Sequence, residues 1–170
     1  RSLREYQSEE ILSADLTGFV LELFIWGYSE YHDIHWLTPP PLPHFLSAKA
    51  TLASLGLIDA KGRVTSLGDK AAGIVVPPRL AAMLLKAESV VEKGIACELA
   101  SLLSDRDIFY SGKGVDVVER LLAVQDYKVN RAEALKAYPI NRSAIEQLLI
   151  SAGSLKKVVH IDQSAVIYSL

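Results

Sequence analysis

The residues best suited to chemistry in this sequence form a short glycine-containing stretch, Ser111-Gly112-Lys113-Gly114. Glycines let backbone N–H groups approach a phosphate, and a lysine and a hydroxyl complete a loop of the G-x-x-x-x-G-K-[ST] type. The stretch lacks that spacing and follows no apolar strand, and an Asp-Glu-Ala-His motif is absent as well. We therefore predict a plain loop here and no nucleotide hydrolysis by this chain.

A second group of interest is a histidine pair, His32-x-x-His35, with Asp33 between its members. Zinc needs three or four converging ligands, and the single cysteine, Cys97, lies in a distant apolar segment. The chain has no G-x-S-x-G nucleophile elbow and no acidic pair in a recognisable cleft. We interpret the histidines as part of a surface loop and predict no metal site and no catalytic residues.

Positive charge is the third source of function, because proteins bind nucleic acids largely through it. From Lys128 onward the chain has six basic residues against three acidic ones, and Tyr127 and Tyr138 beside them could stack on bases. The candidate nucleic-acid contacts are Arg106, Lys113, Lys128, Arg131 and Arg142. A solvated helical face with two half-buried tyrosines is the alternative, and both interpretations stay open.

The elements that must position these side chains begin at Pro39-Pro40-Pro41, where the backbone is held extended. Apolar residues at helical spacing then predict a helix over 42–55. Gly56 stands where a glycine commonly ends a helix. Apolar residues flank Ala60-Lys61-Gly62 and predict a short β-hairpin with these residues at its tip.

The pattern around this hairpin predicts a small domain. Ser66-x-x-Asp69 is a capping box for the following helix. An earlier helix is expected over 13–26, with a buried stripe of Leu16, Phe19, Val20, Leu23 and Ile25/Trp26. A short strand is expected at 34–37. Helix, hairpin and helix in this order predict a winged-helix-like domain over residues 13–74.

Residues 75–158 have the pattern of a helical bundle, so the predicted fold class is mainly α. Pro78 is suited to the first position of a helix, which we expect to run to about Glu92. Gly94 is then expected to separate it from the next helix. Asn130 and Asn141 are suited to capping two later helices, and residues 159–170 form either a tail or an edge strand.

Composition sets further bounds. The chain has 170 residues, of which half are hydrophobic, and a formal net charge of −2. A packed core is therefore expected, whereas a strongly basic nucleic-acid binder is not. A single cysteine is typical of a reducing compartment, so we expect a cytoplasmic protein. No apolar run approaches the roughly 18 residues of a membrane span, and the N-terminal residues are too polar for a signal peptide.

Seven short motifs follow one another over roughly residues 9 to 107. They are Asp15-Leu16 with Val20-Leu21-x-Leu23, Trp26-Gly27, Trp36-Leu37-x-Pro39-Pro40-Pro41, Leu55-Gly56-Leu57-Ile58, Gly62-x-Val64-Thr65-x-Leu67-Gly68, Pro78-Arg79-Leu80-Ala81-x-Met83-Leu84 and Leu102-Leu103-Ser104. Their succession resembles the helicase-associated region, winged helix plus ratchet, of DEAH-box ATP-dependent RNA helicases. The second, sixth and seventh motifs are most similar to the bacterial HrpB-type branch.

This resemblance implies an accessory C-terminal part of a longer helicase, and the absence of an initial Met agrees with that expectation. Residues 1–12 would then leave a missing motor domain. The expected partners are the motor domains of the same polypeptide and single-stranded RNA, bound weakly by this chain alone. ATP and Mg²⁺ would act in the missing motor domains, and no cofactor is expected here.

Two rival functions remain. One is a stand-alone winged-helix DNA-binding regulator, although the helix 42–55 has only Lys49 and His44 as basic groups, and residues 1–78 hold six basic against nine acidic residues. The other is a protein-interaction module without nucleic-acid contact.

Overall fold

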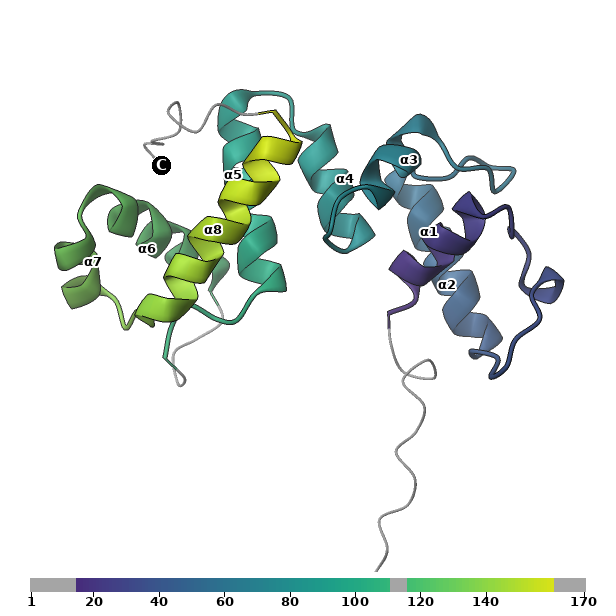
Figure 1. Ribbon diagram of the computed structural model, residues 1–170, viewed down its shortest axis with the longest axis horizontal. Coiled ribbons are helices and arrows are strands. Elements are labelled where there is room, and N and C mark those ends of the chain that lie inside the picture. The colour runs from purple at the N-terminus through teal and green to yellow at the C-terminus, as the bar shows by residue number, and fades with distance from the viewer. Residues whose placement is uncertain (1–14, 111–115, 161–170) are drawn as a thin grey trace, which may run out of the picture. The chain divides into compact units, whose positions relative to one another are not determined.

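The computed structural model describes residues 15–110 and 116–160. The chain divides into two compact units, one ending at Ala82 and the other beginning at Met83. The described residues are mostly helical (Figure 1). The predicted mainly α fold class is therefore confirmed.

The first unit consists of three helices, a 3₁₀ turn and the start of a fourth helix: α1 (Thr17–Ile25), η2 (Tyr31–Asp33), α2 (Leu42–Leu55), α3 (Ser66–Ala72) and α4 (Pro78–Lys86). As predicted, α2 follows the prolines and ends at Gly56, whose φ of 75° is left-handed. α4 begins at Pro78, also as predicted.

The core of the first unit is aromatic. The ring of Phe45, on α2, lies 6.4 Å from that of Phe24, 5.4 Å from that of Tyr31 and 6.3 Å from that of Trp36. Phe45 is itself buried. Aromatic rings in such edge-to-face contacts bury large apolar areas, so this cluster fixes the loop before α2 onto the helices.

The buried face of α1 differs from the predicted stripe. Phe19 and Trp26 were expected inside, yet they are 42% and 69% exposed, whereas Leu21 and Phe24 are buried. α1 contacts both α2 and α3. The buried surface of α1 is therefore wider than the single apolar stripe that packing against one helix would need.

The predicted hairpin is reduced to one antiparallel bridge, between Ile58 and Val64. The Asp59 N–H donates to the Arg63 carbonyl (2.8 Å), and Gly62 has a φ of 74° in the turn. No strand forms within the described residues, and the segment expected as a strand at 34–37 follows η2 as irregular backbone. The N-cap of α3 is Thr65, one residue before the predicted Ser66.

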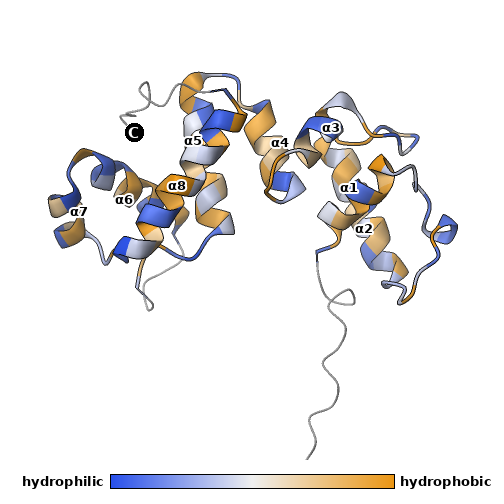
Figure 2. Ribbon diagram, in the orientation of Figure 1, coloured by the Kyte–Doolittle hydropathy of each residue, from blue (hydrophilic) through white to orange (hydrophobic). Residues whose placement is uncertain are grey.

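The second unit begins in α4 and contains α5 (Val90–Ser104), α6 (Val117–Val129), α7 (Arg131–Ala137) and α8 (Arg142–Val158). α5 and α8 lie side by side (Figure 1). Both carry hydrophobic and hydrophilic residues along their length (Figure 2). One hydrophobic core joins α6, α7 and α8 to the loop after α5, through Ile108, Phe109, Ala123, Val124, Tyr127, Ala134, Ile140, Ala144, Ile145 and Leu148.

The single helix expected over 78–92 is two helices. Ser89 caps α5, because its hydroxyl accepts from the Glu92 N–H (3.1 Å) while the Glu92 carboxylate accepts from the Ser89 N–H (3.0 Å). This reciprocal capping box starts a new helix that the apolar pattern conceals. Gly94, expected between helices, is buried inside α5.

Two asparagines begin helices as predicted. The side chain of Asn130 accepts from the Glu133 N–H at the start of α7, and that of Asn141 accepts from the Ala144 N–H at the start of α8. An antiparallel bridge between Phe109 and Ile140 ties the loop after α5 to the α7–α8 connection. The two caps place Arg131 and Arg142 at the first positions of α7 and α8.

Candidate nucleic-acid interface

The five predicted contact residues have different surroundings. Arg106, after α5, and Arg142, the first residue of α8, are exposed. Arg131, the first residue of α7, is exposed too, and its guanidinium lies 5.5 Å from the centroid of the Tyr127 ring. Lys113 lies outside the described residues. Arg106, Arg131 and Arg142 therefore stand on three different segments: the loop after α5, the start of α7 and the start of α8.

Lys128 belongs to a buried ionic cluster that the sequence did not reveal. Glu98 is fully buried on α5, and its Oε1 lies 2.9 Å from the Nζ of Lys128 and 2.9 Å from that of Lys156. Its Oε2 accepts a hydrogen bond from Gln125 (2.6 Å). The partners of Glu98 are 27 to 58 positions away from it in sequence, so no local pattern predicts the cluster.

A second charged contact shapes the loop after α5. Arg120 donates two hydrogen bonds to the Asp107 carboxylate, from Nε at 2.9 Å and from the second guanidinium nitrogen at 2.7 Å. These bonds lower the pKa of Asp107. The Arg120 guanidinium also lies 4.8 Å from the centroid of the Phe109 ring. The backbone next to Arg106 is thereby held in place on α6.

The two tyrosines expected to stack on bases are engaged within the protein. Tyr127 is 2% exposed, and its hydroxyl donates to Glu146 (3.3 Å). Tyr138 is partly buried, stacks on Phe109 at 6.2 Å between centroids, and donates to Asp126 (2.8 Å), a bond that raises the Tyr138 pKa. The face of the Tyr127 ring is therefore closed to a base.

Two cations of the first unit are paired within it. Lys49, the lysine of α2, donates to the Ser29 carbonyl (3.1 Å) and to Glu30 (2.8 Å). Arg63 is paired with Asp59 at 2.7 Å. A helix that reads duplex DNA presents free basic and polar side chains to the groove. This engagement of Lys49 weighs against the rival DNA-binding function.

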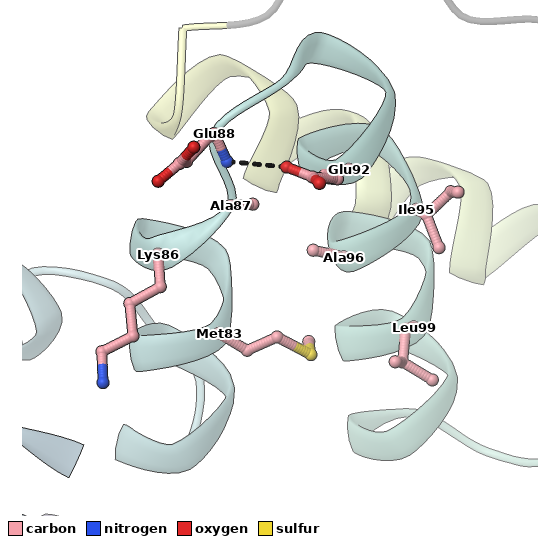
Figure 3. A pocket seen from close by; sticks show the side chains of 8 residues that line it. All are labelled: Met83, Lys86, Ala87, Glu88, Glu92, Ile95, Ala96 and Leu99. Atoms are coloured by element: carbon pink, nitrogen blue, oxygen red, sulfur yellow. Dashed lines mark hydrogen bonds between the residues drawn. The ribbon is translucent and has the colours of Figure 1, made fainter.

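An apolar groove runs between the end of α4 and α5 in the second unit, with a volume of about 490 Å³. Figure 3 shows Met83 pointing from α4 towards α5, which contributes Ile95, Ala96 and Leu99. The Glu92 carboxylate at its rim is occupied by the α5 cap, since it also accepts from the Glu88 N–H (2.9 Å). The lining therefore suits an apolar side chain better than a reacting substrate.

Metal and thiol chemistry have little support in the described residues. No group of three or more His, Cys, Asp or Glu side chains within them could hold a metal ion. Cys97 is buried, and burial raises the pKa of its thiol to about 11. None of the helices in the described ranges is long and apolar enough to cross a membrane.

The sequence of this chain is similar to those of two RNA helicases. No family model matches it. It is 40% identical over 100 residues to the ATP-dependent RNA helicase HrpB of Escherichia coli, which is 58% of this chain and 12% of that protein. It is 28% identical over 125 residues to the probable ATP-dependent RNA helicase DHX35 homolog of Caenorhabditis elegans, covering 69% of this chain and 17% of that protein.

Solved structures agree with the sequences. A crystal structure of the E. coli DExH-box NTPase HrpB matches 93% of the chain with a TM-score of 0.67 and 29% identity. A crystal structure of the E. coli DEAH/RHA helicase HrpB matches 91% with a TM-score of 0.68 and 28% identity. The chain spans 17% of the length of each. The predicted resemblance to the helicase-associated region of HrpB-type helicases is confirmed.

Proposed function

We propose that this chain is an accessory region of an HrpB-like ATP-dependent RNA helicase. In this proposal the first unit is winged-helix-like and packs on the motor domains of the same polypeptide, and the second unit is a ratchet-like bundle beside the path of single-stranded RNA. The observation that carries the proposal is the joint similarity to HrpB in sequence and fold. ATP and Mg²⁺ act in the motor domains, outside this chain.

The surface of the first unit supports protein contact. Trp26 is 69% exposed, and Leu37 and Val75 are fully exposed. Large apolar side chains that protrude in this way gain free energy when a partner covers them. The rival proposal, a protein-interaction module, also requires a protein partner to cover these side chains. RNA contact is therefore the property that distinguishes the two proposals.

RNA contact in the second unit falls to Arg106, Arg131 and Arg142, which are exposed. Arginine forms paired hydrogen bonds with phosphate. Lys128 instead supports the bundle through Glu98. The proposed surface therefore has few cations, which agrees with weak binding by a chain that lacks the motor domains.

The test measures the affinity of this chain for labelled single-stranded RNA at several salt concentrations. Arg106, Arg131 and Arg142 are changed to Ala one at a time. Each change should weaken binding and lower the salt slope by about 0.7 for each phosphate that the variant no longer neutralises. Lys157→Ala, which removes an exposed cation of α8, is the matched control and should change neither. If all three arginine variants keep the parental slope and affinity, the interaction module becomes the better proposal.

A second assay measures ATP hydrolysis by this chain. The chain has no nucleotide-binding loop of the kind that ATPases use. We expect no RNA-stimulated ATP hydrolysis above that of a mock preparation. Hydrolysis that copurifies with the chain and responds to RNA would contradict the accessory role.

A further inference from the structure

A polar pocket in the first unit has no role in the function proposed above. It has a volume of about 330 Å³ and lies between the start of α1, one face of α2 and the first turn of α4. Its hydrogen-bonding side chains are Asp15, Thr17, His44, Ser47, Thr51 and Arg79. Four of these six can donate to an oxyanion without disturbing a contact seen in the structure.

The spacing on α2 explains why polar groups converge here. His44, Ser47 and Thr51 stand at positions i, i+3 and i+7, which share one face of a helix. Ala48, on the same face, lines the pocket with a small side chain. Arg79 reaches the pocket from α4.

These donors have no protein partner within the described residues. The side chains of His44, Ser47, Thr51 and Arg79 form no hydrogen bond and no ion pair there, and the positive charge of Arg79 acts across the pocket on Asp15. This contrasts with Lys49 on the same helix, which is paired with Glu30. A guanidinium fork beside two hydroxyls is the donor set that phosphate oxygens accept from.

Asp15 makes the pocket more selective than a simple anion site. Its Oδ1 accepts from both the backbone N–H and the hydroxyl of Thr17, and these bonds lower the Asp15 pKa, with a smaller contribution from Arg79. Its Oδ2 has no hydrogen-bond donor among the described residues. An ionised carboxylate repels a doubly charged terminal phosphate more strongly than a singly charged diester, and its free oxygen can accept from a hydroxyl.

We propose that this pocket binds one ribonucleotide unit of an RNA strand, with Arg79, Ser47 and Thr51 on a phosphodiester and Asp15 Oδ2 accepting from the adjacent ribose 2′-hydroxyl. The 2′-hydroxyl is the group by which proteins distinguish RNA from DNA. The inference rests on the proposed function for its choice of RNA as ligand. It adds an RNA contact on the first unit, to which the proposed function assigns only packing on the motor domains.

The experiment measures binding of oligouridine RNA and of the matching deoxyuridine strand, by fluorescence anisotropy and by amide chemical shifts of the 170-residue chain. Arg79→Ala should weaken binding of both strands roughly ten-fold, because one charge-assisted hydrogen bond to phosphate is removed. Asp15→Asn keeps an acceptor for Thr17 but replaces the free oxygen with a donor. It should abolish the preference for RNA over DNA without weakening DNA binding.

The control is Lys70→Ala, which removes an exposed cation of the same unit outside the pocket and should change neither affinity. In the parent, RNA should shift the amides of Thr17, Ser47, Thr51 and Arg79. Unchanged affinities in Arg79→Ala, or no shifts at these amides, would overturn the pocket assignment. Equal shifts with inorganic phosphate at the same ionic strength, together with no RNA preference, would overturn the ribonucleotide assignment.

The pocket and the bundle can fail separately. If Arg106, Arg131 and Arg142 variants lose affinity while Arg79→Ala does not, the pocket inference is wrong and the proposed function stands. If only Arg79→Ala loses affinity, the pocket inference stands and the bundle contacts are wrong. If the parent chain gives neither anisotropy change nor amide shifts with RNA, both are wrong.

Discussion

The two units of this chain are stabilised by different interactions. The first gathers aromatic rings around Phe45, and its ion pairs Lys49–Glu30 and Arg63–Asp59 involve partly exposed side chains. The second buries Glu98 between two lysines. The comparison teaches that basic residues counted along a sequence overstate the charge left for a ligand, because part of that charge neutralises a carboxylate inside the protein.

The strongest test of this difference is Glu98→Ala in the second unit. Loss of the carboxylate leaves the buried Lys156 ammonium without the counter-ion that it has in the parent, which typically costs about 3–5 kcal/mol of unfolding free energy. Urea unfolding measures the loss. Glu133→Ala, which breaks the exposed 3.6 Å pair with Lys136, is the control and should cost under about 0.5 kcal/mol. Equal losses in the two variants would contradict the buried-cluster account.

Two helical glycines, one in each unit, differ in the space around the position of a β-carbon. Gly68 of α3 is buried, and a β-carbon there would overlap the Leu57 carbonyl and approach the Val64 side chain. We expect Gly68→Ala to cost about 2–3 kcal/mol, since backbone must move to admit the methyl group. Gly153→Ala in α8 is the opposite case, because nothing lies within 4 Å of the added carbon. It should stabilise the second unit by about 0.5–1 kcal/mol. Thermal unfolding of both variants would show whether the signs differ.

The turn of the first unit gives a smaller effect. Gly62 has a φ of 74° and ordinary contacts around a built β-carbon, so conformational strain dominates there. Gly62→Val should cost about 1–2 kcal/mol, because a β-branched residue is strained at positive φ. An unchanged urea midpoint would contradict the turn geometry.

The smallest expected effect concerns pH and the second unit. Hydrogen bonds from Arg120 lower the folded-state pKa of Asp107. The pair therefore stabilises the fold above the unfolded-state pKa, near about 3.9, and this stabilisation is lost as pH falls through the lower folded-state value. Asp107→Asn should cost under about 1 kcal/mol at neutral pH, since the carboxylate is half exposed. The difference from the parent should disappear in acid, and a constant difference in urea titrations at both pH values would refute the ion-pair contribution.

Local signals in the sequence predicted much of the fold. Gly56, Pro78, Asn130 and Asn141 occupy the caps expected of them, because capping depends on a few neighbouring residues. The apolar pattern continues through the α4–α5 break and conceals it, so that the break is marked only by the capping box of Ser89 and Glu92. The hairpin was overestimated, because flanking apolar residues indicate extended backbone without specifying how far a ladder extends.

The candidate site was less predictable for a physical reason. Arg106, Arg131 and Arg142 are exposed as a contact surface requires. Lys128 is not free to serve such a surface, because a carboxylate 30 positions away in sequence holds it. The polar pocket combines residues from three helices, and only the α2 spacing of His44, Ser47 and Thr51 could have suggested it.

Burial of Cys97 makes this chain convenient for labelling studies. It is the only cysteine of the sequence, and its thiol stays protonated at neutral pH because burial raises its pKa to about 11. Thiol reagents react with the thiolate, so native α5 should resist them until it opens. A fluorophore or spin label attached to a cysteine introduced on the surface of the first or the second unit would therefore report from that position alone. The rate at which Cys97 reacts would measure how often the second unit opens.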